Sequence, residues 1–309
     1  MQLQSEDFRP VEKCQVCGST EFELAYVNKR DVFSLGLIVK NYVCKYCTAV
    51  FQNPLILRDN HDHFANDPTD FSPIYYTIPN KRTSYILKYS KDKGSFLDIG
   101  CGVGYMVKTF KDKGFDAQGL DPDKEFVEIG RKQGLDIIEN DLEHFKTKKK
   151  YDIVCMVAVL NHIPDQLQFL IKTRNLLKDD GIFLLETPDA NDAEGRIKVL
   201  FGSPHPLNYT ERSIKVMLNN IGFDVLDIAE GGINKRLRVI ARKALPKKVT
   251  YKDIGYGNYK SVIKNIKRVH IKHTYFDFSG VKNFFINALF AIFGKKNIQS
   301  LVYKLKSKT

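Results

Sequence analysis

Residues 96–106 read FLDIGCGVGYM, and this stretch decides the fold class. An apolar run over residues 95–99 has the composition of a buried strand, and a helical pattern of apolar residues begins directly after the stretch. Between them lie Gly100, Gly102 and Gly104. Glycines can take a positive φ and carry no Cβ, so a loop of this kind lets a ligand approach the backbone closely. The stretch therefore predicts a strand, a ligand-binding turn and a helix.

The spacing of the glycines distinguishes between two kinds of cofactor. The dinucleotide fingerprint Gly-x-Gly-x-x-Gly would need its third glycine at position 105, where this chain has Tyr105. The spacing therefore argues against a nicotinamide cofactor.

Four more strands are expected in the segments that follow, at residues 115–122, 136–138, 151–165 (a strand and the loop after it) and 176–188 (a helix end, a turn at Gly181 and a strand). Helical patterns separate them, and this alternation predicts an α/β fold with a doubly wound, Rossmann-like sheet. The second strand ends in Asp121, 17 residues after the last glycine. An acidic residue at that distance is placed to accept hydrogen bonds from ribose hydroxyls.

Taken together, these segments resemble the class I S-adenosylmethionine-dependent methyltransferases over about residues 80–243. The resemblance implies a seven-stranded sheet that is closed by a hairpin, for which residues 222–228 and 237–241 fit. It also implies roles in cofactor binding for Asp98 and the loop of Gly100, Gly102 and Gly104 (the methionine end), for Asp121 (the ribose), and for Asp141 with the Leu142 backbone (the adenine).

Four of the six cysteines form two Cys-x2-Cys pairs, Cys14 with Cys17 and Cys44 with Cys47. Two such pairs bring four thiolates together at the tips of two tight turns, which is typical of a closed tetrahedral zinc site. We therefore expect structural Zn²⁺ in a zinc-ribbon module. In so short a segment, metal binding worth about 10–16 kcal/mol can supply most of the folding free energy.

Two histidines follow strands at the edge where the active site is expected. His162 lies in the loop after the fourth strand, and His205 lies in the segment SPHPLNYT (residues 203–210) after the fifth. Methyl transfer from a sulfonium mainly requires positioning of the nucleophile, and a histidine base assists a hydroxyl acceptor near neutral pH. We predict both as catalytic residues; the alternative is that each only hydrogen-bonds cofactor, substrate or loop backbone.

The charge is concentrated at one end of the chain. The net charge is +12 over 309 residues, but residues 242–309 hold 16 basic and only 2 acidic residues, so the rest is close to neutral. This distribution argues against a protein that is uniformly basic and binds nucleic acid along its whole length. Residues 281–293 form an apolar, aromatic helical pattern with basic flanks, which fits either an anchor on an anionic membrane through residues 281–308 or packing against protein.

These patterns divide the chain into four parts. We expect a zinc-ribbon module (residues 1–55), a linker and helical lid (56–94), the S-adenosylmethionine-binding domain (95–243) and a basic, partly amphipathic tail (244–309). The first ten residues, MQLQSEDFRP, do not have the basic and then apolar pattern of a signal peptide. No window reaches 18 apolar residues. We expect a cytoplasmic protein, with the tail as its means of any peripheral membrane contact.

Three functions are compatible with the sequence. A four-cysteine module before such a domain is similar to bacterial sugar and cell-envelope glycan methyltransferases, which implies a small-molecule or glycan acceptor, with a sugar hydroxyl preferred and sugar C-methylation as the alternative. An RNA methyltransferase is the second interpretation, and a non-enzymatic scaffold is the third. The sequence identifies neither the acceptor nor the oligomeric state.

Overall fold

The computed structural model describes residues 7–29, 38–57, 77–90, 93–192, 197–231 and 236–275. The chain divides into two compact units, residues 1–267 and 268–309, and the second is described only as far as residue 275. The amphipathic pattern at 281–293 therefore lies outside the described residues, and its role stays a prediction.

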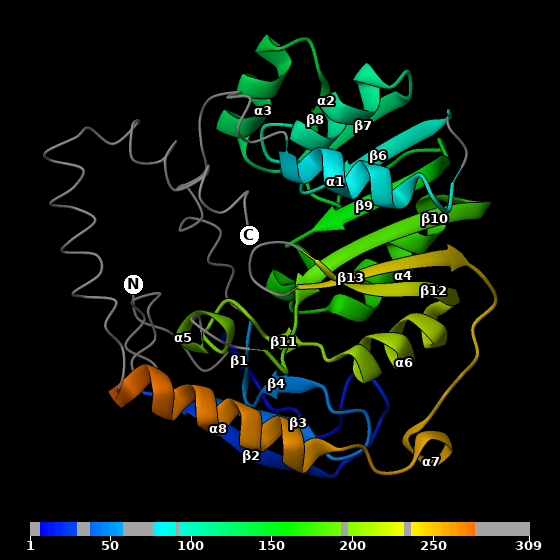
Figure 1. The fold of residues 1–309 in the computed structure, drawn as a ribbon. Helices are drawn as coiled ribbons and strands as arrows, with labels where there is room; N and C mark the ends of the chain where they lie inside the picture. Colours follow the sequence, from blue (N-terminus) through cyan, green and yellow to red (C-terminus); the bar gives the residue numbers. More distant parts are fainter. Residues whose placement is uncertain are drawn as a thin grey trace, which may run out of the picture. The chain divides into compact units, whose positions relative to one another are not determined.

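A seven-stranded sheet forms the centre of the first unit (Figure 1). Its strands are β6 (Ser95–Ile99), β7 (Asp116–Asp121), β8 (Asp136–Glu139), β9 (Tyr151–Val157), β10 (Leu177–Pro188), β12 (Phe223–Gly231) and β13 (Arg236–Lys243). They lie in the order β12-β13-β10-β9-β6-β7-β8. Strands β6 to β10 are parallel, and β13 is antiparallel to both of its neighbours. The expected Rossmann-like α/β sheet and its closing hairpin are confirmed.

The strand order reverses next to β6, because β7 follows on one side and β9 on the other. In open α/β sheets the ligand crevice lies at the carboxyl ends of the strands at such a point. The glycine loop and the loop after β9 therefore meet at the edge where a cofactor and an acceptor would bind.

Helices cover both faces of this sheet. One face packs against α1 (Thr77–Ile86), α2 (Tyr105–Asp112) and α3 (Lys124–Lys132), through buried side chains that include Ile86, Phe110 and Val127. The other face packs against α4 (Gln166–Leu176) and α6 (Glu211–Ile221). Strand β9 reads YDIVCMV and is buried along most of its length, as a central strand between two helical layers must be.

The expected turn at Gly181 is wrong. Strand β10 runs through this residue, and its register against β9 shifts between Leu177 and Ile182. The extra residues are taken up as an irregularity in the strand, so the polar stretch between these two positions does not end it.

The N-terminal cysteine segment forms a second sheet of four strands. Its strands are β2 (Phe22–Asn28), β3 (Val39–Cys44), β4 (Val50–Gln52) and β11 (Leu207–Asn208), in the order β11-β4-β3-β2. Strands β1 (Phe8–Arg9) and β5 (Leu55–Ile56), which flank β2 to β4 in the sequence, form a separate two-stranded antiparallel sheet. Strand β11 comes from the segment after β10, so one strand of this sheet belongs to the predicted active-site loop.

The two sheets share one hydrophobic core. The cluster that contains Cys14, Cys47 and Phe51 is continuous with Met156 of β9 and with the side chains under α4 and α6. After β13, the chain passes over the cysteine segment: Tyr251 donates its backbone N–H to the Cys17 carbonyl (3.1 Å). This stretch includes α7 (Tyr251–Ile254) and leads into α8 (Tyr259–Tyr275). The four-cysteine segment is therefore built into the first unit.

Candidate functional site

The glycine loop has the backbone that its sequence predicts. Gly100, Gly102 and Gly104 have φ values of 69°, 55° and 92°, in the left-handed region that favours glycine. A Cβ on Gly100 would lie 2.2 Å from Cγ2 of Val159, whereas a Cβ on Gly102 would meet nothing within 4 Å. Gly100 is therefore required by packing against the loop after β9, and Gly102 faces open space that a ligand can use.

Asp98, the last but one residue of β6, is buried, with 4% of its surface exposed. Burial raises the pKa of its carboxyl group to about 7, although the nearby guanidinium of Arg82 acts in the opposite direction. A cationic ligand at this position would favour the ionised carboxylate. S-adenosylmethionine carries an ammonium and a sulfonium group, so the donor fits this electrostatic environment.

Asp121, at the end of β7, holds the glycine loop. Its Oδ2 accepts a hydrogen bond from the N–H of Gly102 (2.7 Å), and its Oδ1 accepts one from the N–H of Asp123 (2.9 Å). A carboxylate can accept about four hydrogen bonds, so holding this loop is compatible with binding a ribose hydroxyl. The structure thus brings Asp121 and the glycine loop together, as the sequence predicts.

Asp141 and Leu142 follow β8. Leu142 is buried, whereas Asp141 is half-exposed and pairs with His144, whose Nδ1 lies 2.7 Å from Oδ2. Burial raises the pKa of Asp141, but hydrogen bonds from the ring and the backbone N–H of His144 outweigh this and lower it. His144 therefore orients the carboxylate of Asp141, the group expected to bind the adenine. Nothing in the sequence around His144 indicates this contact.

The two histidines predicted as catalytic lie next to each other. The rings of His162 and His205 are 4.6 Å apart between centroids and tilted by 49°. Nδ1 of the buried His205 lies 2.6 Å from the Val199 carbonyl oxygen. A carbonyl oxygen only accepts, so Nδ1 carries a proton and Nε2 is the basic atom of the neutral ring. The Asn161 amide lies 3.0 Å from Nε2 of His162.

Val159 connects the histidines to the glycine loop. Its side chain packs against Gly100, and its carbonyl oxygen accepts a hydrogen bond from the N–H of His162 (2.9 Å). The preceding residue, Ala158, has a φ of 59°, which is rare for a residue with a Cβ and turns the chain sharply after β9. The loop that carries His162 is therefore placed directly beside the predicted donor site.

Three amide side chains of the four-stranded sheet hold the segment that carries His205. Asn28 and Asn41 each donate to a carbonyl of this segment, those of Lys198 and Phe201, at 3.0 Å. Nε2 of Gln52 lies within 2.6–3.2 Å of three more carbonyl oxygens, those of Gly202, Ser203 and His205. The N-terminal segment therefore fixes the shape of the predicted active-site loop.

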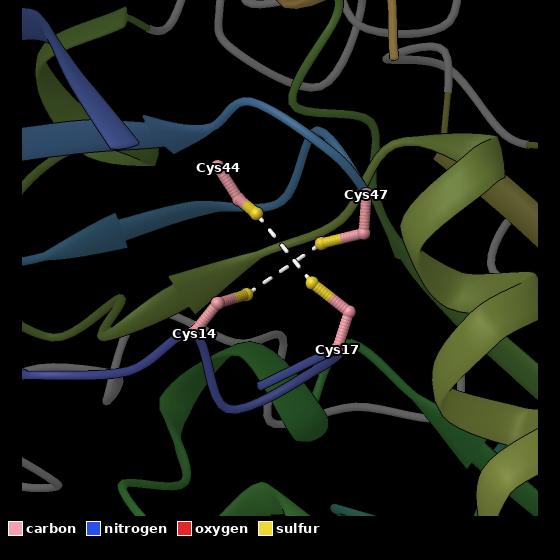
Figure 2. Close-up of side chains that lie close together, drawn as sticks. All are labelled: Cys14, Cys17, Cys44 and Cys47. Atoms are coloured by element: carbon pink, nitrogen blue, oxygen red, sulfur yellow. Dashed lines mark hydrogen bonds between the residues drawn. The ribbon is translucent and has the colours of Figure 1, made fainter. Parts of the chain in front are cut away.

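The four cysteines point at a common centre (Figure 2). The sulfur atoms of Cys14 and Cys47 are 3.5 Å apart, those of Cys17 and Cys44 are 3.6 Å apart, and all four lie within 4.8 Å of one another. A tetrahedron with Zn–S bonds of about 2.3 Å has sulfur atoms about 3.8 Å apart. The donor set and its dimensions therefore fit zinc.

The two cysteine turns share the same backbone. Gly18 and Thr48, which directly follow the Cys-x2-Cys pairs, both have a left-handed φ, 77° and 65°. Each donates its N–H to the carbonyl of the first cysteine of its pair, at 2.9 and 3.1 Å. All four thiols are buried, and burial raises the pKa of Cys47. Thiolates held this close would repel one another, and a bound cation would offset that repulsion.

A buried cluster of charges, which the sequence reasoning missed, lies on the α1 face of the sheet. Glu186 of β10 has no exposed surface and accepts two hydrogen bonds from Arg82 of α1, at 2.7 and 3.0 Å. Arg238 of β13 donates to the same carboxylate at 3.0 Å. These residues are up to 156 positions apart in the chain, and no local pattern in the sequence connects them.

The comparison with protein families defines the class of the domain. Residues 75–228, about half of the chain, match the family model described as a methyltransferase domain. The chain therefore contains a methyltransferase domain, which confirms the expectation drawn from the glycine loop and the strand series.

Two curated relatives illustrate the similarity. The Ubiquinone biosynthesis O-methyltransferase of Actinobacillus pleuropneumoniae serotype 5b (strain L20) is 30% identical over 138 residues, which cover 39% of this chain and 58% of the relative. The protein of that name from Vibrio parahaemolyticus serotype O3:K6 (strain RIMD 2210633) is 28% identical over 182 residues, covering 53% and 76%. The chain thus spans less than two thirds of the length of the first of these relatives.

Two solved structures are similar to this chain at lower identity. The PH0226 protein from Pyrococcus horikoshii OT3 is 20% identical with a TM-score of 0.48, covering 56% of this chain and 92% of that one. The 1,6-didemethyltoxoflavin-N1-methyltransferase of Burkholderia thailandensis is 16% identical with a TM-score of 0.47, covering 56% and 82%.

In the described part of the chain, no helix combines the length and apolar character needed to cross a membrane.

Proposed function

We propose that this protein transfers a methyl group from S-adenosylmethionine to a hydroxyl of a small-molecule or glycan acceptor, with a sugar hydroxyl preferred. One observation supports this most directly. Val159 packs against Gly100 of the predicted donor loop, while its backbone binds His162, whose ring lies beside that of His205. The predicted donor loop and the two histidines predicted as bases therefore lie at one edge of the sheet.

The chemistry follows from this arrangement. The glycine loop and Asp98 hold the methionine end of the donor, Asp121 the ribose, and Asp141 with the Leu142 backbone the adenine. Nε2 of His205 accepts the proton of the acceptor hydroxyl as its oxygen attacks the methyl carbon in line with the departing sulfur. General-base help of this kind contributes roughly 10²–10⁴-fold. His162 orients the acceptor or shares the proton.

We further propose that Cys14, Cys17, Cys44 and Cys47 hold one structural zinc ion. Four cysteines close the tetrahedral shell and leave no open position for chemistry. The metal would stabilise the four-stranded sheet, and Asn41 and Gln52 of that sheet hold the His205 segment. Zinc would thus support catalysis through the shape of the loop.

Cofactor binding is the first test. Isothermal titration with S-adenosylhomocysteine should give a micromolar dissociation constant. Asp121→Ala and Gly102→Val should abolish binding while the zinc content stays unchanged. Retained binding in both variants would show that the donor site is misplaced. No binding by the wild type would instead favour the scaffold interpretation.

The acceptor is tested by labelling. Purified protein is incubated with methyl-labelled S-adenosylmethionine and an extract of its source cells, and the RNA, protein, lipid and small polar fractions are separated. Label in sugar nucleotides or lipid-linked glycan supports the proposal, and the position of the label separates O- from C-methylation. His205→Asn should lower this labelling by about 10²-fold or more. Label in RNA would refute the proposed acceptor class.

A further inference from the structure

We propose that Arg236 binds an anionic group of the acceptor, a phosphate or a carboxylate. This inference rests on the proposed function, because it names the acceptor class of the same site. Arg236 is the first residue of β13, and it lies opposite Pro188, the last residue of β10. It therefore stands at the carboxyl edge of the parallel strands, where ligands of such sheets bind.

Arg236 has a buried nitrogen that lacks a partner in the described part of the chain. Its NH1 atom is shielded from solvent and forms no hydrogen bond among the described residues. Burial lowers the pKa of this guanidinium, the neighbouring Arg82 lowers it further, and Glu186 only partly compensates. Burying a charged donor without an acceptor is costly, so the site is arranged for an anion that completes it.

The nearby carboxylate of Glu186 already accepts hydrogen bonds from two other arginines. Oε1 of Glu186 accepts from Arg82, and Oε2 accepts from both Arg82 and Arg238. Arg238 also lies over the ring of Tyr85, with 5.6 Å between Cζ and the ring centroid. Arg82 and Arg238 are thus held by protein groups, whereas Arg236 has a buried nitrogen that bonds to none of the described residues.

The cluster carries excess positive charge. Arg236, Arg238 and Glu186 share one face of the sheet, because Glu186 lies directly opposite Arg238 and alternate residues of a strand point the same way. Three guanidinium groups therefore meet one ionised glutamate. Asp98 interacts with Arg82, but burial raises its pKa to about 7, so near neutral pH it offsets only part of this charge.

The position favours the acceptor over the donor as the source of the anion. Strand β13 is separated from β6, which carries Asp98 and the glycine loop, by β9 and β10. Three strand spacings correspond to roughly 14 Å. The donor's methionine end is expected over β6, whereas Arg236 lies beyond β10, past the loops that carry the histidines. A planar guanidinium pairs in bidentate fashion with a phosphate or carboxylate, so it would select and orient an anionic acceptor.

Inorganic pyrophosphate is a suitable probe, and the protein is first saturated with S-adenosylhomocysteine. We expect isothermal titration in about 50 mM salt to show that Arg236→Gln weakens pyrophosphate binding at least tenfold. Arg236→Lys, which keeps the charge and loses the fork, should weaken it less. Arg242→Gln is the matched control, because Arg242 is an exposed arginine on the same strand near its other end. It should leave binding within twofold.

Three results would overturn the inference. One is no pyrophosphate binding by the wild type, and another is equal binding by the wild type and Arg236→Gln. The third is a tenfold loss of S-adenosylhomocysteine affinity in Arg236→Gln with unchanged affinity for 5′-methylthioadenosine, which lacks the carboxylate; this would assign the anion to the donor. Failure of the wild type to bind S-adenosylhomocysteine would refute the proposed function separately, since pyrophosphate binding is also measured without it.

Discussion

Replacing Gln52 by glutamate should destabilise the protein far more than the small change in shape implies. Nε2 of Gln52 lies 2.6, 3.2 and 3.1 Å from the carbonyl oxygens of Gly202, Ser203 and His205, and the side chain is fully buried. Its Oε1 has no hydrogen-bond partner among the described residues. A glutamate carboxylate would replace the amide NH2 group of Gln52, which donates, by an oxygen that can only accept and that faces three carbonyl oxygens.

The size of the effect follows from these contacts. An amide nitrogen has two hydrogens, so about two hydrogen bonds are lost, at about 1 kcal/mol each. The carbonyl groups left without a donor add about 1–3 kcal/mol each. We therefore expect Gln52→Glu to lower the free energy of unfolding by at least about 3 kcal/mol. Gln52→Leu, which removes the donor without adding a charge, should cost less.

Urea unfolding followed by circular dichroism measures this directly. Gln168→Glu is the matched control, because Gln168 is exposed in the first turn of α4, and the same change there should stay within about 0.5 kcal/mol. A folded fraction of Gln52→Glu should also show reduced methyl transfer, since the loop that carries His205 loses its support. Wild-type stability in Gln52→Glu would refute the role assigned to this side chain.

Three further predictions concern the donor and metal sites. Folding raises the pKa of Asp98 to about 7, so the folded state keeps this proton over a pH range in which the unfolded state has lost it, and the protein becomes less stable as the pH rises toward 7. In urea unfolding, the free energy of unfolding of the wild type, relative to that of Asp98→Asn, should fall by about 2–3 kcal/mol between pH 5 and pH 7.5. A difference in unfolding free energy between the wild type and Asp98→Asn that stays constant with pH would contradict this. Purified protein should hold about one zinc ion per chain by mass spectrometry; Cys44→Ser should lose it and lower the Tm of the whole first unit, whereas Cys155→Ala should keep it. Gly100→Ala should lower expression and Tm, because its Cβ meets Val159, whereas Gly102→Ala should fold with only a modest loss and weaken S-adenosylhomocysteine binding; equal Tm losses would argue against this difference.

The local parts of the site could be predicted from the sequence. The glycine loop and the position of Asp121 follow from strand, turn and helix signals within about 25 residues, and the Cys-x2-Cys pairs show their spacing directly. The role of Asp98 is implied by the resemblance to the methyltransferases. The two histidines could be placed on the correct edge because they follow two parallel strands that end there.

The supporting contacts could not be predicted, because they join residues that are distant in the chain. Gln52 holds carbonyl groups about 150 positions away, and those are backbone groups, which leave no trace in residue type. Arg236 looks like an ordinary residue of a polar strand until its register against β10 is known. Strand β11 is only two residues long and has no periodicity of its own.

The pairing of β11 with β4 has a consequence for how the chain is made. Residues 50–51 leave the ribosome long before residues 207–208, with which they pair. At about 5–20 residues per second, the missing strand follows roughly 10–30 seconds later. During this interval the amides of Asn41 and Gln52 have none of the carbonyl groups that they later hold. The first segment to be synthesised is therefore among the last to be completed.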